Sequence, residues 1–183
     1  MQSFPIVRYR LAQRVLHWIT ALLIIATIPA GLTMVQEGLA RPTQDALFIF
    51  HKNTGVVILL LVLARIAYRL ANPAPPLPDS LPRWQKAVSH AVHGLLYVLL
   101  IVMAVTGYVR VKAGGFPLEG LDALGLPSLV PRSDTLAETA KAIHATVKSP
   151  VIVLVQLHIL AALYHGIVRR DGVFSRMWFG RTA

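Results

Sequence analysis

Four long apolar segments constrain the fold of this chain most strongly. They cover residues 15–35, 46–70, 87–111 and 147–168. Each is long enough to cross the hydrocarbon core of a bilayer, roughly 30 Å thick, as a helix. The composition agrees, because 55% of the residues are hydrophobic and the mean hydropathy is +0.60, which is too apolar for an ordinary soluble domain. We therefore predict an all-α integral membrane protein, with residues 1–183 forming one four-helix transmembrane bundle.

The first apolar segment follows several basic residues, as the core of a secretory signal peptide does. Three further spans come after it, and no convincing cleavage site follows it. We expect this segment to remain attached as the first transmembrane helix.

The absence of cysteine excludes several kinds of redox centre at once. The chain contains no cysteine, so disulfides, iron–sulfur clusters, thiolate haem ligation and c-type haem attachment are all ruled out. Any redox cofactor must therefore be held by other side chains.

The basic residues divide unequally between the two sides of the predicted bundle. Both termini and the connection at 70–86 fall on one side, which carries eleven Arg and Lys against two Asp, a net charge of +9. The other side carries seven against six, a net charge of +1. The positive-inside rule then predicts that both termini are cytoplasmic. The overall charge of +10 is thus a topology signal, and we expect no nucleic-acid partner.

The connections between the spans have different characters. The inner linker 72–82 contains five prolines, which favour an extended and semi-rigid connection. The outer segment 113–137 is rich in glycine, proline and leucine, and a loop of this length usually has a function. We expect it to pack over the outer mouth of the bundle, with a short interfacial helix. The last helix is expected to begin near Thr135 and to kink at Pro150.

Four histidines lie in or beside the apolar segments, where an ionisable side chain is costly and usually functional. His144 and His158 are fourteen residues apart, so on one helix they are about 40° from eclipsed and about 21 Å apart. One macrocycle cannot use both, but two macrocycles stacked through the bilayer can. His51 lies at a depth close to that of His144, and Gly55 one turn later would let a flat ring approach the backbone.

His17 lies at the inner end of the first span and needs an inner partner. The spacing alone leaves His158, His165, His90 and His93 as candidates. The last three could instead contact water, lipid headgroups or a haem propionate, or belong to a quinone site.

Other metal centres fit these residues poorly. A di-iron carboxylate bundle needs inward glutamates in a Glu-x-x-His pattern, which the spans lack. Catalytic zinc needs a third ligand and a base. Paired imidazoles without further intramembrane ligands are typical of b-type haem. Cations that flank these levels, such as Arg65 and Lys148, could pair with propionates or simply extend to the interface.

Several motifs together are similar to the bacterial cytochrome b561 family. They are Arg-Val-Leu-His17-Trp, Phe-His51-Lys-Asn-Thr-Gly55, the proline-rich linker with His90-Ala-Val-His93-Gly after it, and His144 and His158 followed by Ala-Leu-Tyr-His165. The resemblance covers nearly the whole chain. It implies two haem b groups in the bacterial inner membrane, the inner one bound by His17 and His158 and the outer one by His51 and His144. It also implies electron exchange with ubiquinone.

The resemblance leaves the electron donor open, and the catalytic residues remain unknown. One member of the family oxidises periplasmic superoxide and passes the electron through both haems to quinone, which is the activity we expect here. The alternative is a cytochrome subunit that relays electrons between quinone and a periplasmic redox protein or dehydrogenase. A proton transporter that uses the histidines as a relay is a more distant alternative. Anionic superoxide would be drawn to outer cations, and the candidates are Lys52, Arg110, Lys112, Lys141 and Lys148.

Overall fold

The computed structural model describes residues 7–179, and within them all regular structure is helical, as the sequence predicts. Residues 1–6 and 180–183 lie outside the described part of the chain, and with them Arg181, one of the cations counted on the side of the termini. The elements in chain order are α1 (Leu11–Thr33), α2 (Arg41–Ala71), α3 (Arg83–Ala113), α4 (Glu119–Ala123), α5 (Asp134–Leu163), the π-helical turn η1 (Tyr164–Arg169) and the 3-10 turn η2 (Phe174–Arg176).

Four helical stretches are long and apolar enough to cross a membrane, which confirms the predicted number of spans. They are α1, α2, α3 and the continuous stretch Asp134–Arg169. Several extend beyond the apolar segments, because a helix can continue into the polar interface. Ser133 caps the last of them, its hydroxyl accepting a hydrogen bond from the Leu136 amide at 3.3 Å. The start expected near Thr135 is therefore confirmed.

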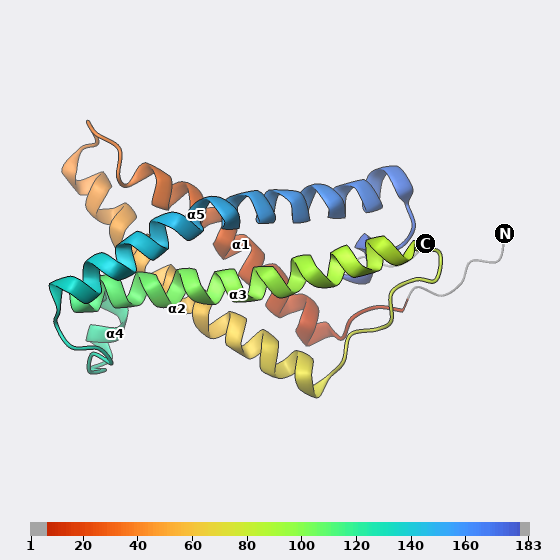
Figure 1. Ribbon diagram of the computed structural model, residues 1–183, viewed down its shortest axis with the longest axis horizontal. Coiled ribbons are helices and arrows are strands. Elements are labelled where there is room, and N and C mark those ends of the chain that lie inside the picture. Colours follow the sequence, from red (N-terminus) through yellow and green to blue (C-terminus); the bar gives the residue numbers. More distant parts are fainter. Residues whose placement is uncertain (1–6, 180–183) are drawn as a thin grey trace.

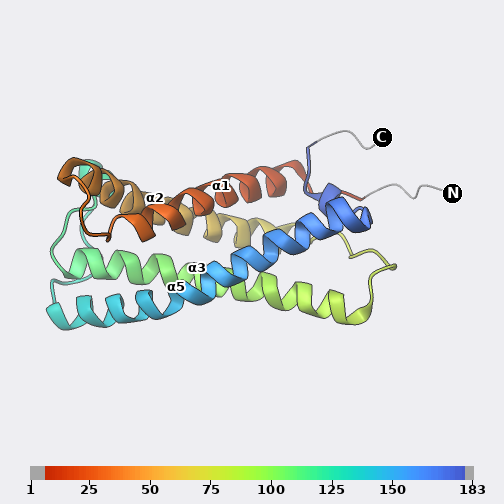
Figure 2. The same ribbon diagram turned by 90° about the horizontal axis from the view of Figure 1, so that it is seen from above.

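The helices form two antiparallel hairpins that pack as two layers (Figures 1 and 2). The most extensive contacts are between α3 and α5, between α1 and α2, and then between α2 and α3. The buried core at their centre is small and consists of Ile24, Ile58, Val62, Leu100 and Val151. Large apolar side chains are exposed along all four helices, as expected for surfaces that contact lipid.

Both ends of the described chain lie at the same end of the bundle, here called the termini end (Figure 2). Arg176, only 3% exposed, ties this end together. Its guanidinium donates hydrogen bonds to the carbonyl oxygen of Val7 at 3.0 Å and to that of Pro76, in the linker, at 2.8 Å. Both ends of the described chain thus lie at one end of the bundle, and the assignment of that end to the cytoplasm stays a prediction.

The opposite end, here called the α4 end, is covered by the segment that follows α3. It contains the short helix α4, as expected for the outer loop, and the Ser133 amide closes it by donating to the Ala113 carbonyl at 2.9 Å. In α5, Pro150 lies inside the helix, and the helix changes direction part of the way along (Figure 1). A proline removes one helical hydrogen bond, which accounts for such a bend.

Candidate functional site

Two histidines face each other near the α4 end. The ring centroids of His51 on α2 and His144 on α5 are 6.3 Å apart. The Nδ1 atom of His51 lies 3.1 Å from the Thr27 carbonyl oxygen, and that of His144 lies 3.0 Å from the Met103 carbonyl oxygen. A carbonyl can only accept, so both Nδ1 atoms carry the proton. The Nε2 lone pairs are therefore free to bind a metal.

A second pair lies toward the termini end. The ring centroids of His17 on α1 and His158 on α5 are 6.1 Å apart. A guanidinium nitrogen of Arg65 is 3.1 Å from Nδ1 of His17. Arginine can only donate, so this Nδ1 accepts, in contrast to its counterparts in the first pair. A metal at Nε2 of His17 would therefore require the Arg65 guanidinium to release Nδ1, which would then carry the ring proton. The Arg65 guanidinium also lies over the Tyr97 ring, 5.4 Å from its centroid.

The structure separates the other three histidines that spacing alone left as partners of His17. His93 lies with its ring centroid 5.2 Å from that of His158, and its Nδ1 is 2.5 Å from the carbonyl oxygen of Ser89. His90 is exposed, and its Nδ1 lies 2.6 Å from the Lys86 carbonyl oxygen of its own helix. His165 contacts Asp171 instead. Only His93 joins the second pair, as a third imidazole.

The spacing of both pairs suits a metal held between two imidazoles. A metal–imidazole bond of about 2 Å puts each ring centroid roughly 3 Å from the metal, so two opposed ligands have centroids roughly 6 Å apart. The observed separations of 6.3 Å and 6.1 Å fit this value. The His93–His158 separation of 5.2 Å is shorter. Within the described residues no group of three or more His, Cys, Asp or Glu is arranged to hold a bare metal ion.

Two glycines make room for the first histidine pair. A Cβ atom on Gly31 of α1 would lie 2.5 Å from Cε1 of His51, and one on Gly107 of α3 would lie 3.3 Å from Cε1 of His144. Gly55, which the sequence suggests for the approach of a flat ring to the backbone, has open space at its Cβ position, with no atom within 4 Å, and that role stays a prediction. Single glycines inside apolar helices were the signal that could have indicated Gly31 and Gly107.

A cavity of about 880 Å³ opens beside this pair at the α4 end. Its lining is mainly apolar and includes both histidines, Gly31, Gly55 and Gly107, and its volume lies in the range of cofactor sites. A flat apolar macrocycle with charged substituents suits such a lining. At the termini end, the crevice that Arg65 and Tyr97 line holds only about 30 Å³.

Most of the five cations expected to attract an anion are already paired at the α4 end. The ammonium groups of Lys52, Lys112 and Lys141 lie 2.8, 2.7 and 2.9 Å from carboxylates. The predicted five-cation cluster is therefore partly neutralised. Arg110 and Lys148 line the cavity, and neither has an ion pair in the part of the chain that the structure describes.

Two of these pairs attach α4 to the bundle. Glu119 accepts hydrogen bonds from Lys52 at 2.8 Å and from the Asn53 amide at 2.7 Å. Burial opposes ionisation of Glu119, but these hydrogen bonds outweigh it and hold the pKa of the carboxyl below its usual value. Hydrogen bonds from Lys112 and from the Leu118 amide likewise lower the pKa of Asp122. Both carboxylates are thus charged at neutral pH.

Comparisons with known proteins agree with this arrangement. A family model described as prokaryotic cytochrome b561 matches residues 8–180. A protein of Yersinia pestis named probable superoxide oxidase CybB is 30% identical over 93% of this chain and 95% of its own length. Two proteins of Escherichia coli, cytochrome b561 homologs 2 and 1, are 28% and 25% identical over 93% of this chain, and over 90% and 96% of their own lengths. The chain therefore belongs to the prokaryotic cytochrome b561 family, multi-pass inner-membrane proteins that bind b-type haem and transfer electrons.

Proposed function

We propose that this protein holds two haem b groups, an outer one between His51 and His144 and an inner one between His17 and His158. The observation that carries the proposal is the presence of two imidazole pairs, with ring centroids 6.3 Å apart in one pair and 6.1 Å apart in the other. One member of each pair, His144 or His158, belongs to α5. Their α5 members are separated by about 21 Å along the axis. Such a stack provides two redox centres on one path across the membrane.

The protein's own groups orient and enclose the cofactors, and the iron of each bound haem supplies the one-electron redox change. The carbonyl oxygens of Thr27 and Met103 hold the Nδ1 atoms of the outer imidazoles, which leaves Nε2 of each ring for the iron. The apolar lining of the cavity excludes water and so affects the reduction potential. Arg65 places a positive charge beside the inner pair.

We further propose that the electron donor is superoxide and the acceptor is ubiquinone. Two superoxide anions would each lose one electron and leave as oxygen, while one ubiquinone takes up two electrons and two protons to become ubiquinol. The name of the Yersinia pestis relative supports this donor. The net charge of +9 on the side of the termini, against +1 on the other side, supports a periplasmic α4 end. There, Arg110 and Lys148 at the cavity would attract an anion.

Rapid mixing of superoxide with the purified, oxidised holoprotein tests this proposal. We expect the haem α-band to appear faster than superoxide disappears uncatalysed, and added ubiquinone to reoxidise the haems. Arg110→Gln should slow the reduction and weaken its dependence on ionic strength. Reduction no faster than the background would contradict a superoxide donor. Reduction only in the presence of a co-purifying periplasmic redox protein would favour the alternative of a relay subunit.

A further inference from the structure

A histidine–aspartate pair lies at the termini end, outside both proposed haem sites. Nδ1 of His165 is 2.6 Å from a carboxylate oxygen of Asp171, and the other oxygen accepts a hydrogen bond from the Val173 amide at 3.2 Å. The two side chains are only 16% and 12% exposed. Asp171 is thus held in place by the backbone, and it orients the imidazole.

The backbone around this pair has an unusual conformation. His165 lies in η1, a π-helical turn that continues α5, and π-helical turns are rare and are often found at functional sites. Arg170 follows with a φ of 48°, a left-handed conformation that is uncommon for a residue other than glycine. Gly166 packs so tightly on Phe174 that a Cβ would lie 3.0 Å from the ring. These features fold the chain back and bring Asp171 onto His165.

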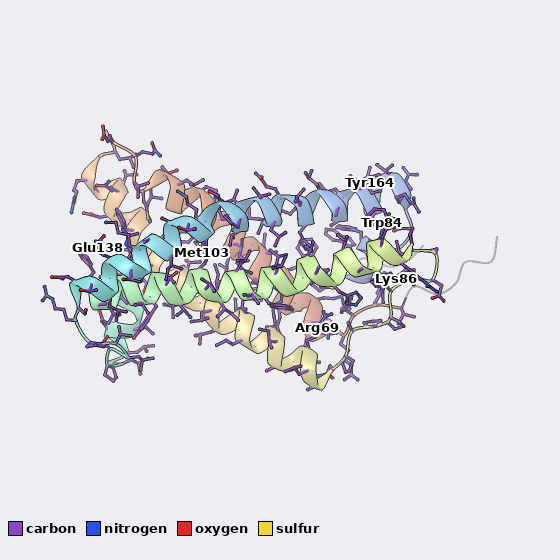
Figure 3. The ribbon with its side chains drawn as sticks, viewed as in Figure 1. Arg69, Trp84, Lys86, Met103, Glu138 and Tyr164 are labelled. Atoms are coloured by element: carbon purple, nitrogen blue, oxygen red, sulfur yellow. The ribbon has the colours of Figure 1, made fainter. Side chains whose placement is uncertain are left out.

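The position of the pair relates it to the inner histidines. His165 follows His158 by seven residues, which on an α-helix is about 10 Å along the axis and about 20° from eclipsed. The side chains around it, Tyr164, Ile167 and Val168, are 46%, 62% and 67% exposed, and Tyr164 lies at the termini end of α5 (Figure 3). A lipid-dissolved molecule can therefore approach this turn, which also lies near the aqueous face.

Reduction of a quinone requires protons as well as electrons. A haem delivers only electrons, so a protein group or water must supply one proton for each electron. An imidazole whose Nδ1 proton is held by a carboxylate is a common proton donor, because the carboxylate stabilises the imidazolium and fixes its orientation. His165 has this arrangement, and its Nε2 atom remains to take up a proton and pass it on.

We propose that His165, oriented by Asp171, donates protons to a quinone reduced at the termini end. This inference rests on the proposed function, since it assumes that the inner haem passes electrons to quinone. In each of two steps the quinone takes one electron and one proton, first giving the semiquinone and then the quinol. His165 gives its Nε2 proton to a quinone oxygen and regains a proton from water at this face. Asp171 is a positioning residue.

Other charged and titratable groups surround this turn and set its electrostatic environment. Tyr164, Arg169 and Arg170 belong to the turn or follow it directly, and Arg176 of η2 is engaged by backbone carbonyls. His158 precedes it on α5, and His93 of α3 lies beside His158. The arginines surround the turn with positive charge, whereas the Asp171 carboxylate places a negative charge directly against the His165 ring.

The test uses the holoprotein with His165→Gln and Asp171→Asn, and a short-chain ubiquinone as the probe. Three quantities are measured: haem content, the rate of haem reduction by dithionite, and the rate of haem reoxidation by the quinone from acid to alkaline pH. We expect haem content and reduction to be unchanged. Reoxidation near neutral pH should fall by roughly a hundredfold in His165→Gln, the lower part of the range for a positioned proton donor. Asp171→Asn should lower it less and move the pH profile.

Two further variants separate proton donation from a purely structural role. Asp171→Glu keeps the carboxylate and should restore most of the rate, and His90→Gln, which alters an exposed histidine of α3, should behave as the wild type. A wild-type rate and pH profile in His165→Gln would overturn the inference. So would a slow Asp171→Glu variant that keeps both haems. If ubiquinone fails to reoxidise even the wild-type haems, the proposed acceptor is wrong instead.

Discussion

The two histidine pairs have nearly the same ring separation but very different surroundings. The outer pair, His51 and His144, has both Nδ1 atoms on backbone carbonyls, two glycines that accommodate the rings, and a large cavity beside it. At the inner pair, the Arg65 guanidinium contacts His17, and a third imidazole lies near His158. Backbone partners orient a ligand rigidly, whereas charged side chains tune it. The difference suggests an outer centre defined by shape and an inner centre defined by charge.

Removal of one histidine from each pair should have the largest effect. Each of His51→Ala and His17→Ala should lower the haem content from two to one per chain, because a single imidazole holds b-type haem poorly. His93→Ala should keep both haems. A pyridine haemochrome assay with a reduced-minus-oxidised spectrum measures this. If His93→Ala lost a haem while His17→Ala kept both, the inner pairing would be His93 with His158.

The glycine beside His51 provides a second test, of the outer centre only. In Gly31→Ala the new Cβ would lie 2.5 Å from the His51 ring, so the ring must move away from its bonding position. We expect most of the outer haem to be lost and the inner haem to remain. Gly94→Ala is the matched control, since its Cβ meets nothing within 4 Å and alanine favours a helix. Full haem content in Gly31→Ala would show that close packing against Gly31 does not fix the position of the His51 ring.

The role of charge at the inner centre can be tested by Arg65→Gln. A positive charge near an iron favours its reduced form, so its loss should lower the inner potential. A unit charge about 10 Å away at an effective dielectric constant of about 20 contributes about 1.7 kcal/mol, or roughly 70 mV for one electron. A potentiometric titration of both haems measures the shift. Arg110→Gln should lower the outer potential instead, and equal shifts of both haems in either variant would contradict separate electrostatic environments.

The smallest expected effect concerns the attachment of α4 over the outer centre. The lowered pKa values of Glu119 and Asp122 mean that their ion pairs stabilise the attachment at neutral pH. This contribution is lost only as the pH falls below about 4, when the carboxylates are protonated. A spin label on Leu124→Cys, in a chain without other cysteines, should therefore gain mobility in acid.

The same label distinguishes the ion pair from a general effect of acid. Lys52→Met should increase label mobility at neutral pH, by a modest amount typical of partly exposed ion pairs. Lys141→Met is the control, because its partner Glu138 is on its own helix α5. Equal mobility in the two variants would show that Lys52 does not hold α4.

Much of the fold was predictable because it depends on local properties of the chain. The apolar segments predicted four spanning helices, and turn-forming residues predicted the long outer loop with its short helix. The contacts of individual side chains were less predictable. The sequence singled out Gly55 but did not show that Gly31 and Gly107 make room for the histidine rings. It also placed five cations at the α4 end without indicating that three of them are ion-paired. Neither feature was predictable, because contacts between helices depend on how each helix is rotated about its axis.

Hydropathy and spacing by themselves determined that this chain crosses a membrane four times and carries histidines at two levels of its last helix. The number of spans follows from the length of the apolar segments, and the two histidine levels follow from the rise and the rotation of about 100° per residue of an α-helix. Both properties act within one segment. Only the tertiary structure decided which histidines face each other, which nitrogen His51 and His144 leave free, and that His165 meets Asp171. Those outcomes depend on helix tilt, on rotation and on one π-helical turn, all set by packing between segments distant in the chain.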